Sequence, residues 1–374
     1  YATIILVTTL IIACPCALGL ATPTSLTVGI GKGAEHGVLI RSGDALQTAK
    51  RLTAIVLDKT GTVTRGEPEL TDIVPTEAFS EEELLLLAAS LEKGSEHPLG
   101  EAIVSGAASR GLVLEDSTHF KAIPGHGVSG EVSGRTVLLG NKKLLEDWSI
   151  DSSGLDERWM ELASQGKTPM YVAVDDRLAG LIAVADTIKE DSAASIKELQ
   201  DMGLVVIMLT GDNQRTAAAI ASQVRINRVL SEVLPQDKAH EVRKLQLEGH
   251  VVAMVGDGIN DAPALAQADV GLAIGTGTDV AIEASDITLI SGSLAGVVTA
   301  MKVSRATMRN VHQNLFGAFI YNTLGIPVAM GFLYPFFGVL LSPLIAAAAM
   351  AFSSVTVVTN ANRLRYFKIA GGER

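Results

Sequence analysis

Charged residues are missing from both ends of this 374-residue chain. Residues 1–31 contain no Asp, Glu, Lys or Arg, and residues 310–362 contain none either. An apolar helix of about 20 residues is long enough to cross the hydrocarbon core of a bilayer. We therefore expect one membrane-spanning helix at the start of the chain and a hairpin of two such helices at its end.

Basic residues flank these apolar segments. Cytoplasmic loops of membrane proteins carry an excess of Lys and Arg, so the flanks should face the cytoplasm and the turn near residues 334–342 the outside. We expect a multi-pass protein of a bacterial-type plasma membrane, with its middle part in the cytoplasm. The flanking residues are Lys32, Arg41, Lys50, Arg51, Lys302, Arg305, Arg309, Arg363, Arg365 and Lys368.

The formal net charge of −11 is concentrated between the apolar ends. An acidic body without a basic patch does not favour nucleic-acid binding, so we expect no nucleic-acid partner. The two cysteines, Cys14 and Cys16, are separated by one residue, and the geometry of a disulfide makes a bridge between them unexpected. The chain starts inside an apolar run without an initiator Met, so we expect an upstream part.

Three short apolar runs have the pattern of buried parallel strands. They are residues 52–57 (LTAIVL), 204–209 (LVVIML) and 251–255 (VVAMV), and helix-like patterns follow the last two. Such units predict a doubly wound α/β domain with its ligand site at the carboxyl ends of the strands. The stretch from Gly66 to Ala183 is long enough to be an inserted domain, with an amphipathic helix at residues 80–91.

The motif DKTGT follows the first expected strand directly and begins with Asp58. Backbone N–H groups of the next loop are free to hold a phosphate there. A carboxylate in that place can attack a phosphoryl group and form an acyl phosphate. A lone Asp is more often a cap or turn residue, but three further motifs favour phosphoryl transfer.

These motifs are TGD (residues 210–212), LPQDK (234–238) and GDGIND (256–261). Each lies at or near the end of an expected strand. Phosphoryl transfer depends on positioning and on neutralising charge on the phosphate oxygens. We expect Thr210 and Lys238 to provide this, together with Mg²⁺ bound by Asp58 and Asp257.

Thr60 distinguishes two kinds of enzyme. A phosphatase would benefit from a second acid two residues after the nucleophile, which protonates the leaving group and activates water. Threonine cannot do this. The acyl phosphate on Asp58 should therefore persist, as a pump requires.

Together, DKTGT, TGD and GDGIND resemble the motifs of the P-type ATPases. CPC, SEHPLG and PGHGVSG resemble those of the members that transport heavy metals. The resemblance covers essentially the whole chain. It implies an α/β fold plus membrane helices: a haloacid-dehalogenase-like, doubly wound phosphorylation domain with an inserted α+β nucleotide-binding domain, flanked by three transmembrane helices.

The expected segments are a CPC helix with its cytoplasmic extension (1–50), the phosphorylation domain (51–66 and 184–300), the nucleotide-binding domain (67–183), and two helices with a short tail (301–374). The resemblance implies phosphorylation residues Asp58, Lys59, Thr60, Thr210, Gly211, Asp212, Lys238, Asn260 and Asp261, with Mg²⁺ at Asp58, Thr60 and Asp257.

The same likeness places ATP near Glu92, His97, Gly125 and Gly127. Glycines let backbone approach a nucleotide closely, and His97 offers a fixed polar contact. Asp186 in ADTIK resembles the DxxK element of the family, although a helix-capping Asp is an alternative interpretation.

Two thiols beside a proline lie within the first apolar segment, where polar groups are costly and usually functional. Thiolates and thioethers favour Cu(I), whereas zinc prefers Cys, His and carboxylate. Buried cysteines and methionines that only pack are the alternative. The YN pair and MAFSS resemble the monovalent-copper subgroup, which implies the ligands Cys14, Cys16, Tyr321, Asn322, Met350 and Ser354.

We therefore expect ATP-driven export of Cu(I), with Ag(I) as a second candidate cargo. Membrane lipid, ATP and Mg²⁺ are the other expected ligands, and a copper chaperone is a candidate partner. The chain contains no TGE motif and no upstream metal-binding module, so alone it should not complete transport. A Zn²⁺ or Cd²⁺ pump, a membrane-tethered phosphohydrolase and a nucleotide-sensing subunit remain alternatives.

Overall fold

The computed structural model describes residues 1–95, 97–212, 214–275 and 279–367. Glu96 of the SEHPLG motif and the basic residue Lys368 lie outside this part. The chain divides into two compact units. The first comprises Tyr1–Ile55, Asp201–Val205 and Ala239–Arg374, and the second comprises Val56–Gln200 and Val206–Lys238.

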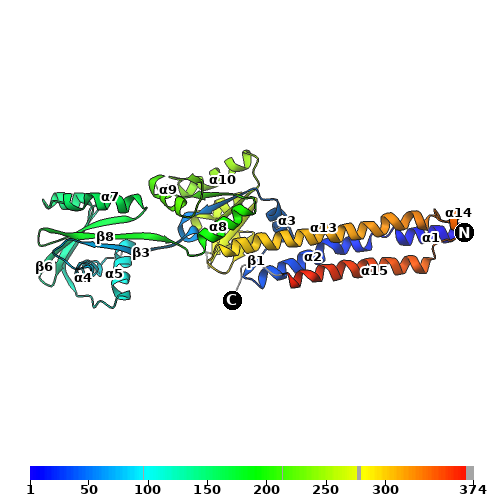
Figure 1. Ribbon diagram of the computed structural model, residues 1–374, viewed down its shortest axis with the longest axis horizontal. Coiled ribbons are helices and arrows are strands. Elements are labelled where there is room, and N and C mark those ends of the chain that lie inside the picture. Colours follow the sequence, from blue (N-terminus) through cyan, green and yellow to red (C-terminus); the bar gives the residue numbers. More distant parts are fainter. Residues whose placement is uncertain (96, 213, 276–278, 368–374) are drawn as a thin grey trace. The chain divides into compact units, whose positions relative to one another are not determined.

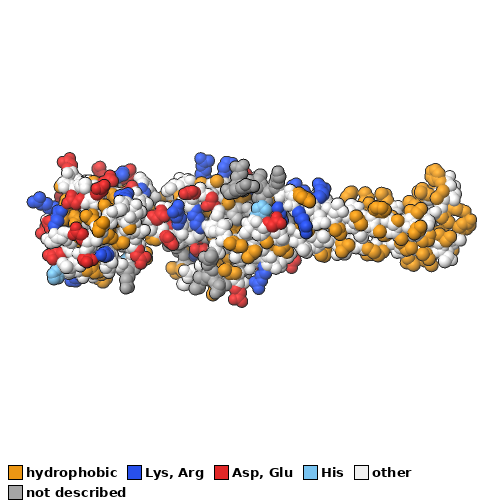
Figure 2. Space-filling model, turned by 90° about the horizontal axis from the view of Figure 1, so that it is seen from below, with side chains coloured by type: hydrophobic (Ala, Val, Ile, Leu, Met, Phe, Trp, Pro, Cys, Tyr) orange, Lys and Arg blue, Asp and Glu red, His pale blue; other side chains and the backbone are white. Residues whose placement is uncertain are grey.

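Four helices pack together in the first unit, two of them end to end and the other two alongside (Figure 1). Their surface is largely apolar, as the orange side chains in Figure 2 show. The first two are separated by a break at Pro15, the residue expected to interrupt the helix. The helices are α1 (Ala2–Ile12), α2 (Cys16–Ala34), α13 (Ala295–Ala329) and α15 (Pro343–Asn362).

Two segments are long and apolar enough to span a membrane, Ala2–Ala34 and Pro343–Tyr366. The third expected span, on α13, does not reach that hydropathy because it contains Asn, His and Gln side chains. Asn314 of α13 is buried and donates to Ser25 Oγ of α2 at 2.9 Å. These polar groups form hydrogen bonds between helices, so α13 packs with its neighbours although its composition is less apolar.

A seven-stranded sheet contains the three strands expected from the apolar runs. Its order is β1-β13-β12-β11-β2-β9-β10, and the division between the units passes through β2 and β9. The pairs β11/β12, β12/β13 and β9/β10 are parallel, and β1/β13 is antiparallel. The strands are β1 (Val38–Ile40), β2 (Ala54–Asp58), β9 (Val205–Leu209), β10 (Arg228–Leu230), β11 (Val252–Gly256), β12 (Val270–Ile274) and β13 (Ile287–Leu289).

Short helices alternate with these strands, as expected for a doubly wound α/β fold. Ser42 caps the first of them, because its Oγ accepts from Ala45 N at 3.2 Å. They are α3 (Gly43–Arg51), η1 (Lys59–Val63), α8 (Ser192–Asp201), α9 (Gln214–Gln223), η3 (Pro235–Asp237), α10 (Lys238–Leu247), η4 (Ile259–Asp261), α11 (Ala262–Gln267) and α12 (Asp279–Ala284). Near the C-terminus lie α14 (Tyr334–Phe337) and η5 (Arg363–Tyr366).

The inserted region is a six-stranded antiparallel sheet in the second unit, with the order β3-β8-β7-β6-β5-β4. The strands are β3 (Thr64–Pro75), β4 (Ser117–Ile123), β5 (Gly127–Val132), β6 (Arg135–Gly140), β7 (Thr168–Val174) and β8 (Arg177–Ile188).

Helices cover both faces of this sheet (Figure 1). Val137 and Leu139 belong to one apolar core and Leu138 to the other, because successive side chains of a strand point to opposite faces. The helix expected at residues 80–91 is present, and Ser80 Oγ caps it by accepting from Glu83 N. The helices are α4 (Glu81–Glu92) and α5 (Pro98–Ser109) on one core, and α6 (Lys142–Asp147), η2 (Ser153–Leu155) and α7 (Asp156–Ser164) on the other.

Candidate phosphorylation, nucleotide and metal sites

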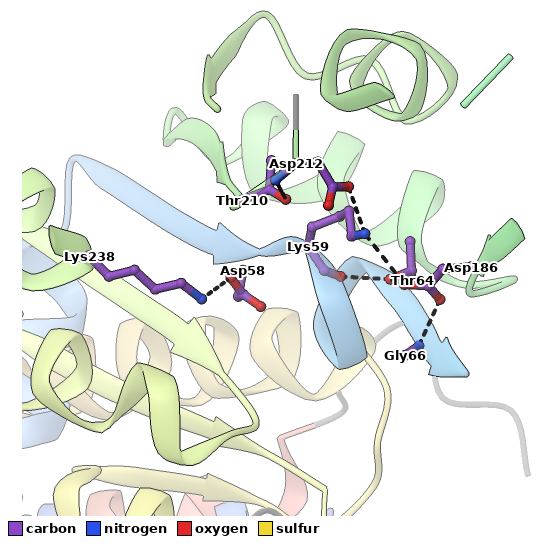
Figure 3. Close-up of polar contacts among 8 residues, drawn as sticks. All are labelled: Asp58, Lys59, Thr64, Gly66, Asp186, Thr210, Asp212 and Lys238. Atoms are coloured by element: carbon purple, nitrogen blue, oxygen red, sulfur yellow. Dashed lines mark hydrogen bonds and ion pairs between the residues drawn. The ribbon is translucent and has the colours of Figure 1, made fainter. Parts of the chain in front are cut away.

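Asp58 is the last residue of β2, and the chain then forms the single turn η1 (Figure 3). Gly61 in this turn has φ 73°, a left-handed conformation that favours glycine. A Cβ on Gly66 would lie 3.0 Å from the Gly61 backbone. Both glycines therefore let the loop fold tightly after Asp58.

Asp58 is buried and forms an ion pair with Lys238, the first residue of α10. The distance from Lys238 Nζ to Asp58 Oδ1 is 2.6 Å, and the two side chains are only 10% and 8% exposed. A charge-assisted hydrogen bond of this length holds one carboxylate oxygen in place. The structure thus brings together the two residues that the separate DKTGT and LPQDK motifs predicted.

Lys59 lies beside two carboxylates from distant motifs. Its Nζ donates to Asp212 Oδ2 at 2.8 Å and lies 3.7 Å from Asp186 Oδ2 (Figure 3). Thr210 Oγ1 accepts from the backbone N of Asp212 at 3.1 Å, which shapes the TGD turn. Gly211 occupies the turn between them. The TGD motif therefore holds the loop that follows Asp58 through Lys59.

Asp186 holds the same loop from β8. Its carboxylate accepts from Thr64 Oγ1 at 2.5 Å and from Gly66 N at 2.8 Å. Lys189 Nζ donates to Gly61 O at 2.5 Å. Asp186 is thus not a helix cap. Thr64 was missed at the sequence level, because its partner is 122 residues away in the chain.

Thr60 lies in the turn with an exposed side chain, and Thr62 Oγ1 is buried without a hydrogen-bond partner among the described residues. Asp257, Asn260 and Asp261 follow β11 in the first unit, with Asp261 buried and Asn260 exposed. A Cβ on Gly256 would lie 2.6 Å from Asp261 Oδ2, so the first glycine of GDGIND makes room for that carboxylate.

The four expected ATP residues, Glu92, His97, Gly125 and Gly127, line one pocket of about 710 Å³ in the second unit. His97 Nδ1 accepts from Leu99 N at 3.2 Å, so Nε2 carries the proton of the neutral ring. Sequence reasoning missed Trp159, Lys167 and Asn141, which line the same pocket. Asn141 Nδ2 donates to Gly125 O at 2.8 Å and so fixes the glycine turn.

Glu92 is a buried carboxyl group in this pocket. Its side-chain Oε2 has no hydrogen-bond partner among the described residues, and the residue is 6% exposed. Burial raises the pKa of Glu92, and the hydrogen bond to Ser95 opposes that effect. A raised pKa keeps a carboxyl group protonated to a higher pH than usual, and the protonated form can donate to a polar ligand atom.

Gly127 has φ 146°, and a Cβ there would lie 2.2 Å from Leu139 O. Only glycine fits this position. The backbone of β5 can therefore lie directly at the pocket wall.

Cys14 and Cys16 form a disulfide, which contradicts the expectation that they would not pair. The reason is the helix break: α1 ends at Ile12 and α2 begins at Cys16, so the Cα atoms lie 5.5 Å apart, within the usual range for a bridge. Asn322 Nδ2 donates to Ile12 O at 2.8 Å and to Cys14 O at 3.1 Å. Asn322 thereby pairs carbonyls that the break leaves without helix partners.

Tyr321 and Met350 pack in one apolar cluster with Ile12. The structure therefore brings Tyr321, Asn322 and Met350 to the end of α1. Ser354 is half-buried on α15. The neighbouring Ser353, which sequence reasoning missed, is buried and its Oγ lacks a partner among the described residues.

Several known proteins are similar to this chain. The chain is 58% identical over 360 residues to the probable copper-transporting ATPase PacS of Synechococcus elongatus, covering 96% of this chain and 48% of that protein. It is 54% identical over 360 residues to a copper-exporting P-type ATPase of Bacillus subtilis, covering 96% and 44%. The chain thus spans about half the length of these curated relatives.

Among solved structures, a zinc-transporting PIB-type ATPase in the E2.Pi state matches with a TM-score of 0.86 and 38% identity, over 95% of this chain and 56% of that one. A structure of the catalytic domain of the CPx-ATPase CopB-B matches with a TM-score of 0.56 and 27% identity, over 73% and 98%.

These matches confirm the resemblance to heavy-metal-transporting P-type ATPases. Together with the two candidate spans they indicate a multi-pass membrane protein. A family profile described as "Hydrolase: haloacid dehalogenase-like hydrolase" matches residues 52–269, more than half of the chain. The chain therefore belongs to the haloacid dehalogenase-like hydrolase family.

Proposed function

We propose that this chain is the phosphorylated and ion-carrying part of a pump that uses ATP to export Cu(I) across a membrane. The observation that carries the proposal is the buried Asp58 at the end of β2, with Lys238 Nζ 2.6 Å from its Oδ1. The names of the relatives, copper-transporting and copper-exporting ATPases, support the cargo and the direction.

In the proposed reaction a carboxylate oxygen of Asp58 attacks the γ-phosphorus of ATP. A new O–P bond forms, the bond to the bridging oxygen breaks, and ADP leaves with that electron pair. Water later attacks the same phosphorus, which releases phosphate and restores the carboxylate. Lys238 holds the reacting carboxylate and offers positive charge to the phosphoryl oxygens, and Thr60 offers no acid or base that would hasten hydrolysis.

Mg²⁺ fits the chemistry of the available donors. The carboxylates of Asp58 and Asp257 and the hydroxyl of Thr60 are hard oxygen ligands, which this ion prefers. Asp257 directly follows β11, the neighbour of β2 in the sheet order. When bound, the ion neutralises charge on the phosphoryl oxygens. Lys59, Thr210, Gly211, Asp212, Asn260 and Asp261 complete the proposed catalytic set.

ATP would bind in the pocket of Glu92, His97, Gly125 and Gly127. The volume of about 710 Å³ suits a nucleotide. Gly127 lets the backbone approach the ligand, and the Nε2–H of His97 can donate to it. The buried carboxyl of Glu92 is a second polar contact.

Cu(I) would bind near Cys14 and Cys16 after reduction, because thiolates and not disulfides are soft ligands. Tyr321, Asn322, Met350 and Ser354 are the other proposed ligands. The spans contain no carboxylate, which favours a monovalent soft ion, Cu(I) or Ag(I), over Zn²⁺ and Cd²⁺. The zinc-transporting structural neighbour keeps a zinc pump as the second candidate.

We also propose that the catalytic parts face the cytoplasm, with a copper chaperone as the delivering partner. The proposed boundaries are 1–50 and 301–374 for the membrane segments, 51–66 and 184–300 for the phosphorylation domain, and 67–183 for the nucleotide-binding domain. Basic residues at the cytoplasmic ends of the spans support this orientation.

The test is phosphoenzyme labelling of the complete pump that contains this chain. With radiolabelled ATP and Cu(I), the native protein should give an acid-stable, hydroxylamine-sensitive phosphoenzyme and Asp58→Asn should give none. Asp116→Asn, an exposed carboxylate paired with Lys93, is the matched control and should label normally. Labelled Asp58→Asn would refute the proposal.

Two further results would select the other classes. Rapid hydrolysis of small phosphate esters without a phosphoenzyme would favour a phosphohydrolase. ATP binding with neither ester hydrolysis nor a phosphoenzyme would favour a nucleotide sensor. Replacing Cys14 and Cys16 by Ser should abolish stimulation by Cu(I). Stimulation by Zn²⁺ in place of Cu(I) would assign the zinc class.

A further inference from the structure

A basic pocket of about 540 Å³ lies beside the middle of α13 in the first unit. It is lined by Lys50, Arg305, Arg309, His312, Gln313 and Phe316. We infer that this pocket binds the phosphate group of an anionic phospholipid. The inference goes beyond the proposed pumping activity, because it depends only on the membrane location of the helices.

One face of α13 supplies most of the pocket. Arg305, Arg309, His312 and Phe316 follow one another at spacings of four, three and four residues, which places them along a single stripe of the helix. Lys50 comes from α3, and its Nζ lies 3.3 Å from His312 Nδ1. The cations therefore converge from two helices.

The two helices are held in place by buried contacts. Ser304 Oγ of α13 donates to Leu46 O of α3 at 2.6 Å. Arg305 donates to Met202 O at 2.8 Å, which fixes that side chain at the edge of the pocket. Lys50 and Arg309 are exposed, and Arg309 forms no ion pair within the part of the chain that the structure describes. Their charge is thus available to a ligand.

The position of the pocket along the membrane normal suits a lipid headgroup. Residues 310–329 of α13 carry no charge, and at about 1.5 Å per residue they rise roughly 29 Å, the thickness of a hydrocarbon core. Arg309 precedes this stretch directly and so lies at the level of the phosphates. Figure 2 shows Lys and Arg side chains gathered where the apolar helices begin.

The apolar wall distinguishes a lipid from a free anion. Phe316 is 69% exposed and lies one turn beyond His312, on the side of the hydrocarbon core. A phosphate in solution would gain nothing from this ring, whereas an acyl chain attached to a bound headgroup would cover it. Guanidinium groups match phosphate oxygens in geometry as well as charge. No acidic side chain lines this pocket among the described residues.

The test measures binding of short-chain phosphatidylglycerol to the purified protein in neutral detergent by native mass spectrometry. Short-chain phosphatidylcholine and glycerol phosphate are the comparison ligands. Phosphatidylglycerol should bind more tightly than both. A basic residue near an anionic membrane contributes about 1 kcal/mol, so Arg309→Gln should raise the Kd roughly fivefold.

The matched control is Arg51→Gln, which removes the same charge one residue from Lys50 but outside the pocket. It should leave the Kd nearly unchanged. Phe316→Ala should weaken phosphatidylglycerol and leave glycerol phosphate unaffected, which separates the lipid from the free anion.

An equal loss with Arg51→Gln would show that general surface charge is responsible and would overturn the proposal. Equal binding of glycerol phosphate would assign a soluble anion instead. If polyglutamate binds and phosphatidylglycerol does not, the ligand is an acidic protein surface. Either of these two results would also overturn the proposal of a lipid site. Phosphoenzyme formation on Asp58 does not enter this assay, so its failure leaves the lipid site testable.

Discussion

Replacing Lys238 by Met removes the ion pair with Asp58 and keeps a side chain of similar length. The pair is almost completely buried, with side chains 10% and 8% exposed. Removing one partner of a buried pair leaves the other charge in a poorly solvated site, which costs about 3–5 kcal/mol. We therefore expect Lys238→Met to destabilise the second unit by that amount.

The loss can be read as a shift in melting temperature. For units of about 150–250 residues, 1 kcal/mol shifts the midpoint by about 2–4 °C, so Lys238→Met should lower it by roughly 6–20 °C. The matched control is Lys244→Met on the same helix, where Lys244 pairs with Glu241 but is 51% exposed. An exposed pair contributes at most about 1 kcal/mol, so the control should melt within a few degrees of the native protein.

A double variant tests the pairing itself. Asp58→Asn removes the charge that Lys238→Met leaves behind, so the double variant should be more stable than the sum of the single effects predicts. Thermal melts in detergent give the melting temperatures of the native protein, the two single variants and the double variant. Additive losses, or a loss with Lys238→Met no larger than that of the control, would refute the assignment of a strong buried ion pair.

Three further changes test the other sites. Gly127→Ala should abolish ATP binding in calorimetric titration, because its Cβ would meet Leu139 O at 2.2 Å. Gly154→Ala is the control and should retain binding, because it has open space at its Cβ. Asn322→Leu should lower the melting temperature, since two carbonyls at the helix break lose a donor at about 1–3 kcal/mol each; an unchanged melt would contradict this role. Burial raises the pKa of Glu92, so the folded chain holds that proton more tightly than the unfolded chain. Its unfolding free energy should then fall as pH rises above the usual carboxyl value of 4.5, and Glu92→Gln should flatten this dependence in melts across pH.

The positions of the main strands could be predicted because each is a continuous apolar run. The residues Ala54 to Leu57 are all buried, as a strand covered on both faces requires. Asp58 follows such a run directly, so its place at a strand end was readable from the sequence. The break after Ile12 was equally readable, because a proline removes a helix hydrogen bond.

The partners of Asp186 could not be predicted. They depend on which residues of β3 and β8 lie opposite each other, and the register shifts between Thr64 and Pro68. An irregularity of this kind leaves no signature in a single sequence. The hydrogen bonds of the Asn side chains in α13 could not be predicted either. These side chains lower the hydropathy of the helix, but Asn314 donates to Ser25 of α2 and to Asn310.

The strands β3 and β8 connect the proposed nucleotide pocket with Asp58. β3 begins at Thr64, immediately after the turn that follows Asp58, and β8 carries Asp186, which holds that turn through Thr64 and Gly66. The six-stranded sheet that contains the pocket is built on the same two strands. A movement of this sheet therefore reaches the loop of Asp58 through β3, β8 and the bonds of Asp186, whereas the Lys238 pair holds Asp58 itself from α10. In the proposed pump, the residues that bind ATP are therefore not the residues that position Asp58. A substitution of Asp186 should alter the rate of phosphorylation without removing the ability to bind ATP.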